Sequence, residues 1–150
     1  MKVLLLLVAL FLPGLAAGEG RVSAVDAAQI RAVIHRQIEA FRRDDAREAF
    51  ALASPGVQEA FGADPERFLD VVRSSYRAVY RPATVAFLDL RVVGVGAVQQ
   101  VQVTDAAGAL WLAYYAMQRQ KDGSWRTSGC HLVPPGKTIS AAYMPTASPR

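Results

Sequence analysis

Residues 109–133 read ALWLAYYAMQRQKDGSWRTSGCHLV, and this stretch decides the fold class. Apolar and polar residues alternate on both sides of the central KDGS, which is typical of two strands that each present one face to a core. The sequence therefore predicts a β-hairpin, with strands over Ala109–Gln120 and Trp125–Val133 and a turn over Lys121–Ser124.

The register of this hairpin decides which side chains share a face. A two-residue loop would set Arg119 opposite Arg126, and like charges directly opposite one another are unfavourable. We therefore expect a three-residue loop with Gly123 in the left-handed region, which pairs Arg119 with Trp125. On this register one face carries Trp111, Ala113, Tyr115, Met117, Arg119, Trp125, Thr127, Gly129 and His131, and the other carries Leu112, Tyr114, Cys130 and Leu132.

Two further strands are predicted before the hairpin, because a period of two begins after Pro82. In the first strand Leu88, Leu90 and Val92 are expected on the core side. Asp89 then faces away from the core, where it can pair with Arg91. In the second strand valines alternate with glutamines over residues 100–104. The four predicted strands thus form a meander.

The first half of the domain shows helical spacing instead. One apolar stripe consists of Ile30, Val33, Ile34, Ile38 and Phe41. Asp26 is the expected N-cap of this helix, with Gln29 in the capping-box position.

A second short helix is expected to open at Asp44–Asp45 and to stop at Ser54–Gly56, with a further short turn up to Phe61–Gly62. The clearest helix start is Asp64–Glu66, because a capping side chain precedes a proline and an acidic residue. This third helix is expected to end by Arg81–Pro82.

The N-terminal segment, residues 1–18, is predicted to be a signal peptide. Lys2 precedes the apolar run Val3–Leu12, and Pro13–Gly14 then precede small residues. The run is too short for a membrane span, so no stable span is expected after cleavage. The sequence therefore predicts an exported protein, periplasmic or secreted, with one α+β domain over residues 22–133 and a mobile tail over 134–150.

Composition excludes several classes of function. The chain of 150 residues is 52% hydrophobic and carries a formal net charge of +4. Its arginines are spread along the chain between acidic residues, so no nucleic-acid partner is expected. Cys130 is the single cysteine, which rules out an intramolecular disulfide. No phosphate-binding glycine loop or His/Cys ligand cluster occurs, so neither a cofactor nor a metal is predicted.

Several stretches resemble a known family. They are Gln37–Phe41, Asp45 with Ala49–Phe50 and Ala53–Pro55, Val72–Tyr76 with Arg81–Pro82, and Arg119–Arg126 with Gly129–Cys130. On these residues the chain is similar to the bacterial family of domain of unknown function 4864, within the nuclear transport factor 2-like domains. The resemblance implies N-terminal helices packed on a curved antiparallel sheet, which form a cone. It implies no activity, because the wider fold hosts isomerases, dehydratases and binding modules.

Candidate residues for proton chemistry are His131, Tyr115 and Tyr76, since neutral imidazole or phenol can serve inside a cavity. His131 is a weak candidate, because no carboxylate partner that would orient it can be identified. Cys130 and His131 are neighbours on a strand, so their side chains point to opposite faces and cannot form a thiolate–imidazolium pair. Cys130 is therefore expected to be buried and inert.

A ligand site is also possible on the aromatic face of the sheet. The candidate ligand-binding residues are Tyr76, Trp111, Tyr115, Arg119 and Trp125, with Arg73 and Arg77 nearby. Arginine would contact an anion, so the ligand would be a small acidic or aromatic compound. The alternative reading is that the aromatic residues are core and the arginines are surface.

Three functions follow from these features. The first is a non-catalytic module that binds a small ligand or acts as an accessory protein. The second is a small cofactor-free isomerase or hydratase that uses His131. The third is a structural homodimer, which would form if the aromatic sheet face were exposed.

Overall fold

The computed structural model describes residues 21–137 of the chain. The predicted signal peptide and residues 138–150 of the predicted tail lie outside the described residues. The elements are α1 (Ala24–Arg42), α2 (Ala46–Ala51), α3 (Pro55–Ala60), α4 (Pro65–Ser75), α5 (Arg77–Tyr80), β1 (Thr84–Val93), β2 (Gly96–Thr104), β3 (Leu110–Arg119) and β4 (Trp125–Val133). Among residues 21–137, none of the helices combines the length and the apolar content of a membrane span.

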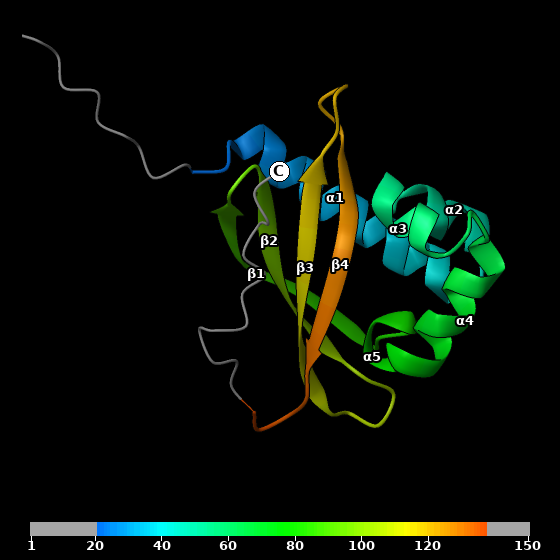
Figure 1. Cartoon of the computed structure of the whole chain (residues 1–150). Helices are drawn as coiled ribbons and strands as arrows, with labels where there is room; N and C mark the ends of the chain where they lie inside the picture. The colour runs from blue at the N-terminus through cyan, green and yellow to red at the C-terminus, as the bar shows by residue number, and fades with distance from the viewer. Residues whose placement is uncertain (1–20, 138–150) are drawn as a thin grey trace, which may run out of the picture.

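The strands form a four-stranded antiparallel sheet in the order β1-β2-β3-β4, so each strand pairs with its neighbour in sequence. Helix α1 runs across one face of the sheet, and α2 to α5 gather beyond the edge formed by β4 (Figure 1). We call the face that packs against α1 the inner face. This architecture confirms the predicted α+β class, with helices first and a meander after them.

Helix α1 begins earlier than predicted. Its N-cap is Ser23, whose Oγ accepts a hydrogen bond from the Asp26 backbone N–H at 3.0 Å. The prediction of Asp26 as N-cap was wrong, because Asp26 occupies the third helical position and faces Ser23 instead. There its carboxylate accepts from the Ser23 hydroxyl at 2.8 Å, whereas in a capping box the acidic side chain accepts from the backbone N–H of the N-cap residue.

The starts of α2 and α4 agree with the predicted starts, whereas α3 begins at the predicted stop of the second helix, where only a short turn was expected. Asp45, Ser54 and Asp64 each accept a hydrogen bond from a backbone N–H in the first turn of α2, α3 and α4. The third predicted helix, however, is interrupted at Tyr76, whose φ of −125° lies outside the helical region. The interruption turns the chain, so that α5 leads directly into β1.

The hairpin of β3 and β4 has the predicted register near its turn. Arg119 pairs with Trp125, and Gly123 adopts a φ of 86°, as the three-residue loop requires. Beyond Met117 and Thr127 the register shifts, because Ser128 has no partner and Gly129 pairs with Ala116. The predicted faces are therefore wrong from Ser128 onward. Cys130 pairs with Tyr115, and His131 pairs with Tyr114.

This β-bulge coincides with a second pairing of β4. The segment after α2 lies beside Thr127, where the Ser54 N–H donates to Thr127 O at 2.8 Å and the Thr127 N–H donates to Leu52 O at 2.9 Å. Thr127 is thus held between β3 and this segment. A bulge directly after such a fixed point redirects the rest of the strand, because a one-residue shift exchanges its two faces.

Strand β1 is irregular as well. Its register shifts between Phe87 and Leu90, and both of these side chains pack against the core. Leu88 and Val92, which were predicted on the core side, are exposed instead. The irregularity takes Leu88 out of the period of two, whereas Val92 keeps the alternation with Leu90 and is exposed near the end of the strand. Asp89 lies on the surface 3.6 Å from Arg91, as predicted.

The irregular segment is joined to β2 by a buried amide. The Gln99 Nε2 donates to the backbone carbonyls of Leu88 and Asp89. These bonds satisfy carbonyl groups that a regular strand would bond to its neighbour. The shift in β1 therefore has a structural partner inside the sheet.

Two apolar clusters stabilise the domain. The first lies between α1 and the inner face, where Ile30, Ile34 and Ile38 pack against Val101 and Tyr115. The second lies among the helices and is built from Phe41, Phe50, Phe68 and Leu69. The two clusters meet beside Tyr76, which packs against both of them.

Candidate functional site

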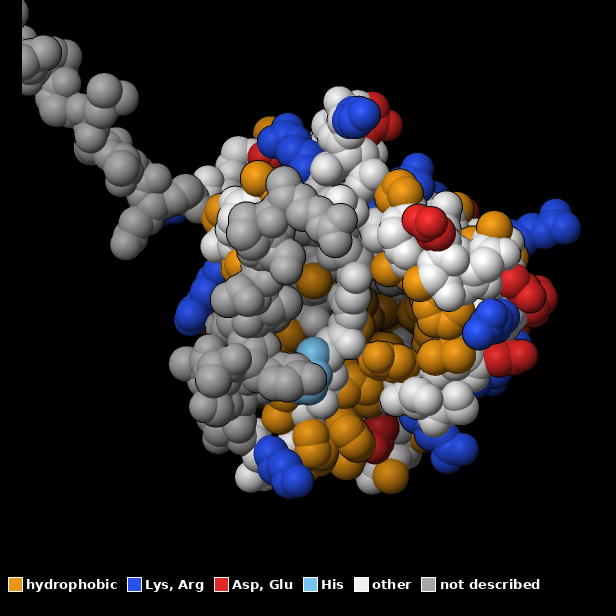
Figure 2. Space-filling model, viewed as in Figure 1, with side chains coloured by type: hydrophobic (Ala, Val, Ile, Leu, Met, Phe, Trp, Pro, Cys, Tyr) orange, Lys and Arg blue, Asp and Glu red, His pale blue; other side chains and the backbone are white. Residues whose placement is uncertain are grey.

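A pocket opens where the two apolar clusters meet, between β4 and the helices. Its cavity volume is about 150 Å³. Figure 2 shows a hollow lined by hydrophobic side chains in this region. The lining residues come from α1, the α3 region, α4, α5, β3 and β4, and they are Gln37, Phe41, Val57, Phe61, Phe68, Val71, Val72, Tyr76, Val79, Tyr115, Thr127, Gly129 and Cys130. None of these side chains is acidic or basic.

Phenyl rings form one wall of the pocket. The Phe61 ring meets the Phe68 ring edge to face, with centroids 5.3 Å apart and planes at 85°. The Phe41 ring is tilted by 40° against the Phe68 ring, at a centroid distance of 6.1 Å. Such tilted contacts leave ring faces and edges available for a further aromatic ring.

The polar side chains at the base of the pocket bond to one another. The Gln37 Nε2 donates to the Ala49 carbonyl and to Thr127 Oγ1, at 2.9 Å each. The Thr127 hydroxyl donates to the Leu52 carbonyl at 3.3 Å. These bonds connect α1, α2 and β4, and they use both protons of the amide.

Tyr115 differs from these groups. Its side chain is 2% exposed, and its hydroxyl makes no hydrogen bond to any residue of the described range 21–137. Burial raises the pKa of Tyr115 well above its usual value, and the neighbouring Cys130 raises it further. The hydroxyl is therefore protonated at neutral pH and offers a free donor beside the pocket.

Cys130 also lines the pocket, in contrast to the predicted assignment to the opposite face. The bulge at Ser128 places it on the inner face across from Tyr115. Burial raises the pKa of the thiol to about 12. The side chain is half-buried, whereas a buried one was predicted. Since the thiolate is the nucleophile, the raised pKa supports the inertness of Cys130, which stays a prediction.

His131 lies on the outer face of the sheet, and its side chain is exposed. The prediction that His131 shares a face with Tyr115 and Trp125 was wrong, because the bulge at Ser128 exchanges the two faces of β4. A base on the outer face cannot reach a ligand in this pocket, so the residue proposed for the isomerase or hydratase alternative is absent from the lining.

The predicted ligand-binding residues divide into two groups. Tyr76 and Tyr115 line the pocket, whereas Trp111, Arg119 and Trp125 do not.

Trp111, Arg119 and Trp125 each make polar or aromatic contacts outside the pocket. The Trp111 indole donates to Asp105 and the Trp125 indole donates to Asp26, each at 2.9 Å. Arg119 lies over the Trp125 ring, 5.8 Å from its centroid, and 3.5 Å from Asp26. Helices cover the inner face that carries both tryptophans, whereas the homodimer alternative requires an exposed aromatic face.

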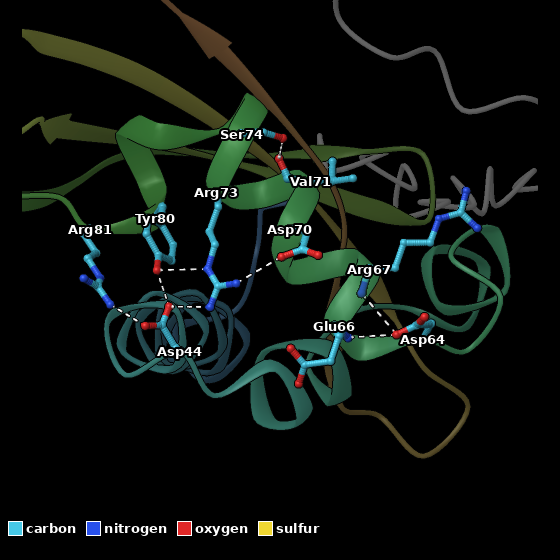
Figure 3. Close-up of polar contacts among 10 residues, drawn as sticks. All are labelled: Asp44, Asp64, Glu66, Arg67, Asp70, Val71, Arg73, Ser74, Tyr80 and Arg81. Carbon is cyan, nitrogen blue, oxygen red and sulfur yellow. Dashed lines mark hydrogen bonds and ion pairs between the residues drawn. The ribbon is translucent and has the colours of Figure 1, made fainter.

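Arg73 belongs to a separate polar cluster on the outside of the helices, shown in Figure 3. Its guanidinium donates to Asp44 and Asp70 at 3.0 Å each and to the Tyr80 hydroxyl at 3.2 Å. Asp44 also accepts from Tyr80 and Arg81, and the hydrogen bond from Tyr80, followed by that from Arg73, lowers its pKa. The cluster ties the α1–α2 turn to α4 and α5, so Arg73 has a structural role.

Most of the pocket wall was not predicted from the sequence, including Gln37, Phe41, Phe61 and Val79. One signal was available, because Gln37 is a polar residue beside Ile34 and Ile38 on the buried side of α1. A polar side chain at a core position needs buried partners and therefore marks a special site. The phenylalanines carry no such signal.

Within residues 21–137, no group of three or more His, Cys, Asp or Glu side chains could hold a metal ion.

Comparisons with known proteins agree with this architecture. The family model of a domain of unknown function (DUF4864) matches residues 23–139. No curated protein matches the chain. The chain is similar to the crystal structure of an NTF2-like protein of unknown function from Shewanella baltica OS155, with a TM-score of 0.52 and 14% sequence identity. That match covers 76% of this chain and 99% of the other.

Proposed function

The chain belongs to the DUF4864 family, whose function is unknown, and from this premise we propose that it is an exported, non-catalytic module that binds a small apolar ligand. The observation that carries the proposal is the pocket of about 150 Å³ between β4 and the helices, whose lining has no acidic or basic side chain. A small apolar pocket reached from the surface is a default ligand site.

The size of the pocket limits the ligand. Pockets for drug-sized molecules occupy about 300–1,000 Å³, whereas an apolar cavity of about 150 Å³ in another protein holds benzene. The ligand is therefore about the size of one six-membered ring. A non-catalytic role is favoured because the lining holds no imidazole or carboxylate, and because the raised pKa values of the Cys130 thiol and the Tyr115 phenol make both groups poor bases while they are protonated.

We expect benzene to bind this pocket and Val72→Phe to weaken the binding. Val72 lines the pocket, and a phenyl group at this position would occupy the space of the ligand. Binding is measured from the shifts of valine methyl signals in NMR spectra during a benzene titration. Saturable shifts of Val57, Val72 and Val79 are expected in the wild type, with an affinity at least about tenfold lower in Val72→Phe.

Two variants serve as controls. Val72→Ala enlarges the pocket and should retain benzene binding. Val92→Phe makes the same change as the test variant on β1, outside the pocket, where Val92 is 41% exposed. The absence of a saturable shift in the wild type would refute ligand binding. Equal binding by Val72→Phe and Val92→Phe would place the ligand elsewhere.

Export is proposed from the segment 1–18, in which Lys2 precedes the apolar run Val3–Leu12. We expect the protein recovered outside the cytoplasm of a bacterial host to begin near Gly18 or Glu19, as determined from its intact mass. The double variant Leu5→Arg with Leu7→Arg interrupts the run and should stay in the cytoplasm at full length. A membrane-bound wild type that retains Met1 would instead indicate an anchor.

A further inference from the structure

We infer that the pocket selects neutral aromatic compounds of one ring that carry an oxygen atom, and that the Tyr115 hydroxyl recognises this oxygen. The inference rests on the proposed function and adds the chemical class of the ligand.

Among the residues that line the pocket, Tyr115 carries the buried polar atom that lacks a partner; the other unpaired buried atom in the described part of the chain, Gln99 Oε1, belongs to a residue outside the lining. The Tyr115 hydroxyl is buried without a hydrogen bond to any residue in the described part of the chain. Leaving a buried polar group unpaired is unfavourable, and such groups in native proteins normally have a partner of some kind. A ligand oxygen at this point would accept a hydrogen bond from the phenol.

The other polar groups of the lining do not compete for that oxygen. Both protons of the Gln37 amide and the Thr127 hydroxyl are engaged in bonds within the protein. Cys130 is a weak donor. Tyr76 is half-buried, and its hydroxyl is not among the buried groups that lack a partner. Tyr115 is thus the one buried strong donor of the lining, so the ligand needs one oxygen at this point.

The aromatic wall favours a flat ring. Phe61 already meets Phe68 edge to face at 5.3 Å, and Phe41 and Tyr76 line the same pocket. An aromatic ligand can continue this tilted arrangement, which contributes beyond the burial of its surface. The cavity of about 150 Å³ leaves room for one ring.

Charge excludes anionic aromatic compounds. The lining has no basic side chain, and Arg73 outside it is held by Asp44, Asp70 and Tyr80. A carboxylate would lose its hydration in the pocket without gaining an ion pair, which is costly. Of the acidic and the aromatic ligand that the sequence suggested, the uncharged lining therefore favours the aromatic one.

The test compares phenol with toluene, which has the same size but a methyl group in place of the hydroxyl. Dissociation constants are measured by methyl NMR for the wild type and for Tyr115→Phe. We expect Tyr115→Phe to weaken phenol binding about three- to tenfold, the usual range for one neutral hydrogen bond, and to leave toluene binding unchanged or tighter. Benzoate should bind at least about a hundredfold more weakly than phenol.

The fold of the variant is checked separately. Because the Tyr115 hydroxyl has no partner within the described residues, Tyr115→Phe should keep or raise the urea midpoint of unfolding. Tyr76→Phe is the matched control, since it removes the other phenol of the lining and should leave the phenol-to-toluene ratio unchanged.

The outcomes separate the two proposals. If neither phenol nor toluene binds the wild type, the proposed function fails. If both bind but Tyr115→Phe leaves their ratio unchanged, the pocket stands and the role of Tyr115 is refuted. A ratio that changes in Tyr76→Phe instead assigns recognition to Tyr76, and benzoate binding tighter than phenol refutes the selection of neutral compounds.

Discussion

Replacing Trp125 by alanine should lower the free energy of unfolding by about 3–5 kcal/mol, the range for a large core side chain reduced to alanine. Trp125 is 7% exposed and packs in the cluster between α1 and the sheet. Its indole also donates to Asp26 near the start of α1. The substitution therefore removes a core contact and a hydrogen bond between the first helix and the last strand. Urea titration with an unchanged slope measures the loss.

The matched variant Trp125→Phe keeps an aromatic ring and removes the indole donor, so its loss should be smaller. The Trp125 hydrogen bond is the main cause that lowers the pKa of Asp26, with Ser23 and Arg119 also contributing. In Trp125→Phe that pKa should rise toward its usual value, which carboxyl NMR can follow.

The lowered pKa stabilises the wild type above the usual pKa of an aspartate, and this contribution is lost as the pH falls through the lowered value. In Trp125→Phe the free energy of unfolding should therefore decrease less than in the wild type as the pH falls through this range. A cost below about 1 kcal/mol for Trp125→Ala would contradict the core position.

Gln37→Leu should destabilise the domain by about 2–4 kcal/mol, because one buried amide serves two acceptors. Its Nε2 bonds to the Ala49 carbonyl and to the Thr127 hydroxyl, and the side chain is 3% exposed. Leucine has a similar size but no donor, so the Ala49 carbonyl would stay buried without this partner. The loss is measured by urea unfolding.

A matched control lies on the same helix, because Gln29 is exposed and Gln29→Leu should change stability by less than about 0.5 kcal/mol. Thr127→Val removes the second partner while it keeps the shape of the side chain. The double variant of Gln37 and Thr127 should cost less than the two single changes together, since they remove one shared bond. Full additivity would show that the bond contributes nothing.

The local features of the fold could be predicted from the sequence. The caps at Asp45 and Asp64 and the turn at Gly123 depend on side-chain chemistry within a few residues, which a sequence displays directly. The cap of α1 was misplaced by three residues because both Ser23 and Asp26 are suitable. Burial of Trp125 was also predicted, from its place in the alternating pattern.

The two strand irregularities could not be predicted. At the bulge, Thr127, Ser128 and Gly129 are small or polar, so no apolar residue marks the change of face. Its position coincides with the pairing of Thr127 with the segment after α2, a contact between residues far apart in sequence. In β1 the shift is joined to Gln99 of the neighbouring strand.

The candidate site was predicted in part for the same reason. Tyr76 and Tyr115 were identified because aromatic residues stand out in a helix and a strand. Arg119 and Trp125 were grouped with Tyr115 because the hairpin places these three residues on one face. Yet the pocket lies beside β4, while the tip of the hairpin contacts Asp26 at the opposite end of α1. Whether a residue lines the pocket depends on its position along the strand as much as on the face that carries its side chain.

The bulge at Ser128 has a consequence for how such a domain evolves. It determines that Cys130, and not the adjacent His131, lies beside Tyr115 on the inner face. A descendant in which this half of β4 paired without the bulge, in the register of the turn, would exchange every inward side chain beyond position 128 at once. The imidazole of His131 would then face the pocket in place of the Cys130 thiol, although neither residue had been substituted. Insertions and deletions in the last hairpin are therefore a route by which related domains can acquire or lose a base without changing the residues that supply it.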